Sequence, residues 1–376
     1  MHENEHPNSL SQYLSIITDP RVDRTKDHLL HDILLIAILA MLCGAETFVD
    51  FQDFGRAKET WLRTFLKLPH GIPSHDTFGR VFALLDPKQF AECFRHWTQS
   101  LRRSFAQEIV AIDGKTVRRS HDRAQGQSAI HMVSAWASEN GLVLGQIKTA
   151  EKSNEITAIP ALLRALELRG CIVTIDAMGT QKTIAKEIHE ADAEYVLALK
   201  GNHERVHEEV KDFFCDARAR GFQKLPHDFL ETIEKDHGRI ETRRYWITGQ
   251  IGWFADRSLW EGLHSFGMVE SIRQIQGIST AEIRFFLCSI KADAKEFARA
   301  VRGHWGIENK LHWSLDVAFG EDQCRVRVGY AAENLARLRH IALNILKADT
   351  TKKRGIKGKQ KNAGWDHAYL LHLLSI

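Results

Sequence analysis

The chain has 376 residues, with 51 Lys and Arg against 48 Asp and Glu, so its formal net charge is only +3. This length predicts two or three domains, and 44% hydrophobic with 26% charged residues is a globular composition rather than a disordered one. The small net charge excludes binding to a polyanion through bulk charge alone. Any such binding must use local patches.

The six cysteines are scattered along the chain and form no C-x-x-C pair, which favours free buried thiols over disulfides or zinc ligands. The opening residues, MHENEHPNSL, lack the pattern of a secretory signal. The longest apolar run, Ile33–Cys43, is about half of the ~20 residues that cross a bilayer. We therefore expect a cytoplasmic protein with no membrane segment.

Residues 1–105 are predicted to form an all-α domain. Residues 29–43 are apolar nearly all round, as in a buried helix. Ser74 can cap a helix over residues 75–85, and Pro87 opens another that runs to about residue 103.

Helical spacing also covers residues 48–68, and a short Gly/Pro turn at residues 69–73 joins this helix to the one over residues 75–85, which resembles a helix-turn-helix. In that interpretation His75, Thr77 and Arg80 face a DNA groove. An ordinary helical packing unit has the same spacing, so the sequence leaves both interpretations open.

From residue 106 the pattern changes to that of strands. Five strands are predicted, at residues 108–113, 129–138, 142–149, 171–176 and 194–200. Asn140-Gly141 is a strong hairpin signal, and helices are expected from Asn154 to residue 168 and over residues 181–190. The order βββαβαβ predicts an α/β fold with an open mixed sheet and helices on its faces, because parallel returns need crossover helices.

A β-rich insertion is expected over residues 201–290. Its two hairpins are predicted to turn at His237-Gly238 and between residues 275 and 283. Helical spacing then returns over residues 294–317 and 331–347. The expected domains are 1–105, 106–200 together with 291–347, 201–290, and 348–376.

The last of these segments is predicted to be a basic tail with one short helix over residues 369–374. Seven basic residues against Asp349 give residues 347–361 a local charge of +6. Such a run can neutralise phosphates with salt-sensitive affinity. A solvated linker without a partner is the alternative.

Two carboxylates are predicted to stand side by side. Asp113 ends the first strand and Asp176 ends the fourth, and these strands are natural parallel neighbours in a βββαβ arrangement. Gly114 and Gly179 leave room for a ligand nearby. Like charges at this spacing need a cation, and hard oxygen ligands favour Mg²⁺ or Mn²⁺.

A third carboxylate, Glu308, falls on the apolar face of a helical wheel for its helix. A carboxylate that faces a packed surface is costly without a cation or other partner. His304 and His312 flank Glu308 at i−4 and i+4, so a separate zinc site formed by these three residues is an alternative.

Several long motifs, taken together, resemble the insertion-sequence transposases of the H-repeat-associated branch. The motifs are AIDGKTVRRS at 111–120, TIDAMGTQ at 174–181, DHGRIETR at 236–243 and HWGIENKLHWSLDV at 304–317. Stretches at 32–37, 71–78 and 321–327 extend the resemblance over nearly the whole chain.

The resemblance implies a DDE transposase with an RNase H-like catalytic core and a β-rich insertion before the Glu-bearing helix. Asp113, Asp176 and Glu308 match the family's acidic triad, which is expected to be catalytic and to hold two Mg²⁺ ions, with Mn²⁺ as a substitute. The implied partner is double-stranded DNA, as element ends and as target, in a bacterial, nucleoid-associated setting, and paired ends would suit a homodimer. The candidate DNA-binding residues are Lys115, Arg118, Arg119, Arg302, Lys310, Lys352, Lys353 and Arg354.

The chain departs from the related Tyr-x2-Arg-x3-Glu-x6-Lys signature. Those four positions hold Val301, His304, Glu308 and Leu315. The residues that grip the terminal phosphate, and whether cleavage passes through a DNA hairpin, therefore stay open. A DNA-binding remnant or regulator of an element, or a stand-alone Mg²⁺-dependent nuclease, are the alternative functions.

Overall fold

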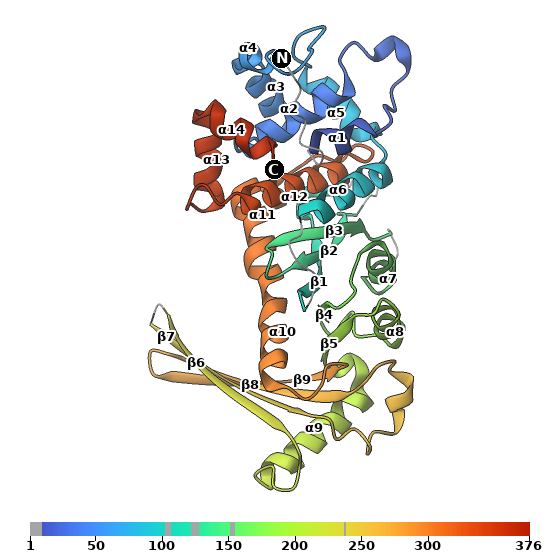
Figure 1. The fold of residues 1–376 in the computed structure, drawn as a ribbon, viewed down its shortest axis with the longest axis vertical. Coiled ribbons are helices and arrows are strands. Elements are labelled where there is room, and N and C mark those ends of the chain that lie inside the picture. The colour runs from blue at the N-terminus through green and yellow to red at the C-terminus, as the bar shows by residue number, and fades with distance from the viewer. Residues whose placement is uncertain (1–9, 102–106, 122–127, 151–154, 237) are drawn as a thin grey trace.

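The computed structural model describes residues 10–101, 107–121, 128–150, 155–236 and 238–376. Its fold is mixed α/β, with a helical region that contains the N-terminal part of the chain (Figure 1). The predicted fold class is confirmed at this level. None of the helices in the described ranges is long and apolar enough to cross a membrane.

The N-terminal helices follow the predicted pattern closely. They are α1 (Leu10–Ser15), α2 (Leu30–Leu42), α3 (Phe48–Ala57), α4 (Glu59–Leu62), α5 (His75–Leu84) and α6 (Pro87–Leu101). Helix α2 is buried along nearly its whole length, which explains why it is apolar all round. The Ser74 hydroxyl accepts a hydrogen bond from the Thr77 N–H, as expected of an N-cap.

The C-terminal residues differ from the predicted basic tail. They form two helices, α13 (Ile356–Trp365) and α14 (His367–Leu374), which pack on α2 and on α12 (Ala331–Ala348). Side chains of both helices belong to the same apolar core as α2. The basic run thus contains a folded part of the helical region, in which Lys359 and Gln360 are themselves buried.

One sheet of nine strands runs through the molecule in the order β3-β2-β1-β4-β5-β9-β8-β7-β6. The first five strands are β1 (Ile109–Thr116), β2 (His131–Ala137), β3 (Leu142–Lys148), β4 (Ile172–Ile175) and β5 (Glu194–Leu199). Strand β1 pairs antiparallel with β2 and parallel with β4, and β4 pairs parallel with β5. The crossover helices are α7 (Glu155–Ala165) and α8 (Lys182–Glu190). Asn154, the predicted cap of α7, lies outside the described residues.

The insertion is β-rich, as predicted, and it continues the core sheet. Its strands are β6 (Asp228–Asp236), β7 (Arg239–Thr248), β8 (Ser265–Ile275) and β9 (Ile278–Cys288), and β9 pairs antiparallel with β5. The second hairpin turns at Gln276-Gly277, both with positive φ, which lies within the predicted interval, and its second strand begins at Ile278, earlier than the predicted residue 283. Of the predicted first turn, Gly238 also has positive φ, whereas His237 lies outside the described residues.

The insertion also contains a helix that the sequence pattern did not predict, α9 (Glu204–Ala219). Its buried residues, Val206, Val210, Phe214 and Ala217, recur at helical spacing. The many charged residues between them obscured this narrow apolar stripe.

A continuous helical column runs from the insertion towards the helical region (Figure 1). It consists of α10 (Ala294–Gly306), a π-helical stretch over Ile307–His312, and α11 (Trp313–Phe319). The column confirms the helix predicted for residues 294–317, but the π-helical stretch was not predicted. Helices α6, α10 and α12 pack against the sheet in one layer and α7 and α8 in another.

Candidate active site

Asp113 and Asp176 are adjacent because of the register between β1 and β4. The last residues that pair between the two parallel strands are Ile112 and Ile175. Asp113 and Asp176 are the residues that follow them in the sequence. Strand β1 continues past Asp113 to Thr116 instead of ending there, because residues 113–116 pair with β2. The Asp113 Oδ1 accepts from the Gly114 N–H at 2.9 Å, and the Asp176 Oδ1 accepts from the Gly179 N–H at 3.2 Å.

Asp113 is held in an environment that disfavours its charge. Burial is the main reason why the pKa of Asp113 is raised to about 7. The hydrogen bond from the Gly114 N–H opposes this increase, and the negative charges of Glu155, Asp176 and Glu308 each add a smaller one. All three predicted acids therefore lie close enough to interact electrostatically. A carboxylate in this environment would be stabilised by a bound cation, so the raised pKa marks Asp113 as a candidate site residue.

Glu308 is solvent-exposed, so its predicted position on the apolar face is wrong. The helical wheel extended the apolar face of α10 past Gly306, but a π-helical stretch begins at Ile307 and the buried positions there are different. Ile307 and Leu311 take the buried positions instead. Short π-helical stretches are rare and frequently occur at functional sites.

The two histidines beside Glu308 have different partners. His304 Nδ1 lies 3.1 Å from the Thr174 hydroxyl, and His312 Nδ1 lies 3.7 Å from Asp113 Oδ2. Burial lowers the pKa of both imidazoles, that of His312 to about 4. The structure does not bring His304, Glu308 and His312 together as a zinc site.

Within the described ranges, no three His, Cys, Asp or Glu side chains converge closely enough to hold one metal ion. The same statement applies to the acidic triad, so metal binding requires at least one of its side chains to rearrange. The donor set nevertheless fits a hard divalent cation, because it offers carboxylate oxygens and because the carboxylates of Glu155, Asp176 and Glu308 all lie within electrostatic reach of Asp113.

Glu155 and His131 border the acids and were not selected from the sequence. His131 Nε2 lies 2.8 Å from Glu155 Oε1, and Thr116 Oγ1 lies 2.9 Å from His131 Nδ1. A Cβ on Gly114 would collide with both the Glu155 carboxylate and the His131 ring, so this glycine is needed for close approach. The only sequence signal was a carboxylate at the start of the helix that follows the third strand.

Lys115 does not point to free solvent. Its ammonium donates to Asp316 at 2.7 Å, Glu321 at 3.1 Å and Asp322 at 3.2 Å. Burial alone would lower the Lys115 pKa, but the charges and hydrogen bonds of Glu321 and Asp316 raise it above its ordinary value. The ammonium group of Lys115 is therefore engaged in internal ion pairs and is not free to bind a DNA phosphate.

The other predicted DNA-binding residues lie in three places. Arg118 and Arg119 are exposed just after β1, with Arg118 Nε 3.2 Å from an Asp322 oxygen. Lys352, Lys353 and Arg354 lie between α12 and α13. Arg302 and Lys310 are exposed on the helical column.

The candidate groove-facing residues of α5 are accessible to different degrees. His75 and Arg80 are exposed and Thr77 is half-buried. The His75 N–H donates to the Gln52 side chain at 2.9 Å, which anchors the start of the helix.

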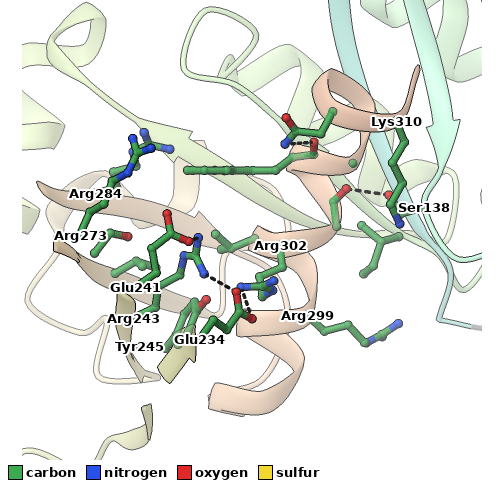
Figure 2. Close-up of a pocket in the computed structure, with 18 of the residues that line it drawn as sticks. Ser138, Glu234, Glu241, Arg243, Tyr245, Arg273, Arg284, Arg299, Arg302 and Lys310 are labelled. Atoms are coloured by element: carbon green, nitrogen blue, oxygen red, sulfur yellow. Dashed lines mark hydrogen bonds and ion pairs between the residues drawn. The ribbon is translucent and has the colours of Figure 1, made fainter. Parts of the chain in front are cut away.

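A basic pocket of about 590 Å³ lies between α10 and strands β7, β8 and β9 (Figure 2). Seven cationic and three carboxylate side chains line it, an excess of four positive charges. The cationic residues are Arg239, Arg243, Arg273, Arg284, Arg299, Arg302 and Lys310, and the acidic ones are Glu139, Glu234 and Glu241.

Part of this charge is neutralised internally. Glu234 pairs with Arg302 at 2.9 Å and with Arg243 at 3.2 Å, as Figure 2 shows. Among the described residues, Arg273 and Lys310 have no ion-pair partner, so their charges are available to a ligand.

The basic pocket adjoins a smaller cavity beside Asp176. This cavity, of about 80 Å³, is lined by Asp176, His304, Arg284 and Trp305, of which the last two also line the basic pocket. The Arg284 guanidinium lies 4.9 Å from the Trp305 ring centroid. Arg284 and Trp305 thus form the boundary between the acids and the basic pocket.

Comparison with known proteins is consistent across the chain. Residues 11–98 match a family described as DDE_Tnp_1-associated, and residues 104–345 match the family described as Transposase DDE domain. The H repeat-associated putative transposase YhhI of Escherichia coli K12 is 40% identical over 97% of this chain and 97% of its own. The putative transposase YncI of Escherichia coli O157:H7 is 41% identical over 98% of this chain and 94% of its own.

A solved synaptic complex of piggyBac transposase with hairpin DNA aligns with 98% of this chain and 77% of that chain, at 11% identity and a TM-score of 0.44. This likeness is too weak to carry a conclusion. The family match and the full-length relatives are sufficient: the chain belongs to the DDE transposase family, as its motifs predicted.

Proposed function

We propose that this protein is a DNA transposase that cuts the ends of an insertion element and joins them to target DNA. The observation that carries the proposal is the adjacency of Asp113 and Asp176 at the end of two parallel strands, in a buried place where other carboxylates lie within electrostatic reach of Asp113. Family membership supports the same activity.

The core that holds these residues is proposed to be RNase H-like. The order β3-β2-β1-β4-β5, with β1 antiparallel to β2 and parallel to β4, supports this assignment. In this arrangement two acids come from neighbouring central strands and the third comes from a helix packed on them.

Asp113, Asp176 and Glu308 would hold divalent metal, Mg²⁺ or Mn²⁺, as two ions. Bound divalent ions supply a nucleophile at neutral pH and stabilise the leaving oxygen in phosphodiester hydrolysis and transesterification. The protein's part is to bring three carboxylates within electrostatic reach of one another at a partly buried place. Burial first, and the neighbouring carboxylates to a smaller degree, raise the pKa of Asp113, and a bound cation would offset both effects.

The basic pocket is proposed to bind the DNA strand that reaches the acids. A strand at Asp176 would pass Arg284 and Trp305 to enter it, because these two residues line both spaces. Arg273, Arg302 and Lys310 would then bind phosphates in place of the Tyr, Arg and Lys that the related signature provides. Because two element ends must be cut, we expect two copies of the protein to act together.

The proposal is tested with labelled DNA that carries the repeats flanking the gene, in Mg²⁺ or Mn²⁺. We expect nicking at the repeat boundary that is lost in Asp113→Ala, Asp176→Ala and Glu308→Ala and retained in Asp212→Ala, a control at an exposed carboxylate of α9. Light scattering of the protein–DNA complex would show whether two copies assemble.

Other outcomes identify the alternatives. Binding without cleavage would indicate a DNA-binding regulator or remnant, and cleavage without end preference would indicate a simple nuclease. Full activity of Asp113→Ala together with loss in His304→Ala would show that the metal assignment is wrong.

A further inference from the structure

The ammonium group of Lys115 joins two segments that are far apart in the sequence. Lys115 belongs to β1, and its three carboxylate partners belong to α11 and to the short turn of helix that follows it at Glu321–Gln323. The three N···O distances are between 2.7 and 3.2 Å. The Lys115 ammonium group therefore forms ion pairs with three carboxylates at once.

The centre of the cluster is shielded from solvent and its edge is not. The Lys115 and Glu321 side chains are 12% and 2% exposed, whereas those of Asp322 and Asp316 are 19% and 36% exposed. Glu321 is also 3.8 Å from the guanidinium of Arg339, which is 1% exposed. Charge pairs with little solvent are screened weakly, and removal of one partner leaves an uncompensated buried charge.

The position of Lys115 relates the cluster to the proposed metal site. Lys115 follows Asp113 by two residues in the same strand, so both side chains lie on one face of the sheet. On the other side, Asp316 lies in the same helical column as Glu308, two turns further on. The ion pairs therefore tie the strand of the first acid to the helix of the third.

The position of Glu308 depends on such contacts elsewhere in its helix, because its own side chain makes none that would fix it. It is exposed, and among the described residues its carboxylate makes no hydrogen bond or ion pair. Its distance from Asp113 is consequently set by where the helical column sits against β1. Packing of Ile307 and Leu311 fixes part of that placement, and Lys115 adds a polar clamp close to the acids.

We propose that Lys115 is a positioning residue, whose ion pairs with Asp316, Glu321 and Asp322 hold the Glu308 helix against β1 so that the carboxylates can share divalent metal. The inference rests on the proposed function. It assigns Lys115 a role in metal affinity and none in DNA contact.

The test compares Lys115→Met with the full-length wild-type protein. We expect the affinity for Mn²⁺, titrated by electron paramagnetic resonance without DNA, to fall 10- to 100-fold, as is usual when a group that orients metal ligands is lost. DNA affinity in EDTA, and its dependence on salt, should stay at the wild-type values. Lys115→Arg should recover part of the Mn²⁺ affinity, and Lys186→Met, at an exposed pair on α8, should change neither quantity.

The opposite pattern would overturn the inference. A Lys115 that contacts phosphate predicts unchanged Mn²⁺ affinity, weaker DNA binding and a salt slope smaller by about 1. If Lys115→Met fails to fold, Asp316→Asn removes one partner more gently, and unchanged Mn²⁺ affinity in that variant would equally overturn it. Wild-type protein whose Mn²⁺ binding is absent, or survives Asp113→Ala, would refute the proposed function itself and this inference with it.

Discussion

The Nδ1 atom of His312 lies 3.7 Å from the Oδ2 atom of Asp113, yet it brings no positive charge to the site at neutral pH. Burial, and then the charge of Lys115, lower the pKa of His312 to about 4, so the imidazole is neutral. The neutral His312 therefore does not offset the negative charges of the three carboxylates near Asp113. This arrangement makes the stability of the metal-free protein sensitive to pH.

We expect Asp113 to destabilise the metal-free fold as pH rises from about 4 to about 7. The pKa of Asp113 is 3.8 in the unfolded chain and about 7 in the fold, so in this window the folded state binds the extra proton and loses stability as the proton leaves. The full shift corresponds to at most about 4 kcal/mol. Urea denaturation of the wild type and of Asp113→Asn in EDTA, at pH 5 and pH 8, measures it.

The comparison between the two proteins is needed because His312 acts in the opposite direction. Its pKa is lowered in the fold, so its contribution to stability rises with pH between about 4 and 6.5. The variant should gain stability over the wild type as pH increases. An equal dependence on pH in both proteins would contradict the assigned cause.

Gly114→Ala should destabilise the fold by about 1–3 kcal/mol, because the new methyl group would push Glu155 and His131 out of their contact. The matched control is Gly201→Ala, where nothing lies within 4 Å of the added Cβ and φ is not positive. The free energies of unfolding from urea titrations should differ between the two variants. Equal free energies of unfolding in the two variants would contradict the prediction, because they would mean that Glu155 and His131 can move apart at little cost.

Lys310→Ala and Arg273→Ala should each weaken binding to element-end DNA and reduce the slope of log K against log salt by about 1. Both cations line the basic pocket without an ion-pair partner in the described part of the chain. Lys186→Ala on α8 removes a charge from an exposed pair and serves as the control. Anisotropy titrations in EDTA at several salt concentrations separate this effect from metal binding, and an unchanged slope would exclude the pocket as a phosphate site.

Lys359→Met should lower the free energy of unfolding by about 1–3 kcal/mol. The buried Lys359 ammonium donates to the Leu346 carbonyl at 2.7 Å and lies 3.3 Å from Asp349 Oδ2, so its loss leaves a buried carbonyl without this donor, while Asp349 keeps the hydrogen bonds from Thr351 and Tyr369. Lys361→Met, at an exposed residue of the same helix, should stay within about 0.5 kcal/mol of the wild type. A similar small effect at both positions would mean that the basic run is solvated after all.

Local signals in the sequence predicted the parts of the fold that depend on near neighbours. The cap at Ser74, the hairpin around Gly141 and the strand that precedes Asp176 are all set by short-range rules. The side-by-side placement of Asp113 and Asp176 followed from strand order alone, because a parallel return fixes which strand ends meet.

What the sequence missed depends on long-range contacts. Glu308 is exposed and lies in a π-helical stretch, which no periodicity in the sequence marks. Lys115 was expected to contact DNA because its carboxylate partners lie some two hundred residues further along the chain. The triad's catalytic and metal-binding roles stay predictions.

The packing of α13 and α14 on α2 has a consequence for biosynthesis. Residues 356–374 complete an apolar core that begins at the first helices, so the helical region cannot finish folding until nearly the entire chain has left the ribosome. Helices α1 and α3 can cover part of α2 early, but the part of its apolar surface that α12, α13 and α14 cover stays exposed in a nascent chain until these helices have been made.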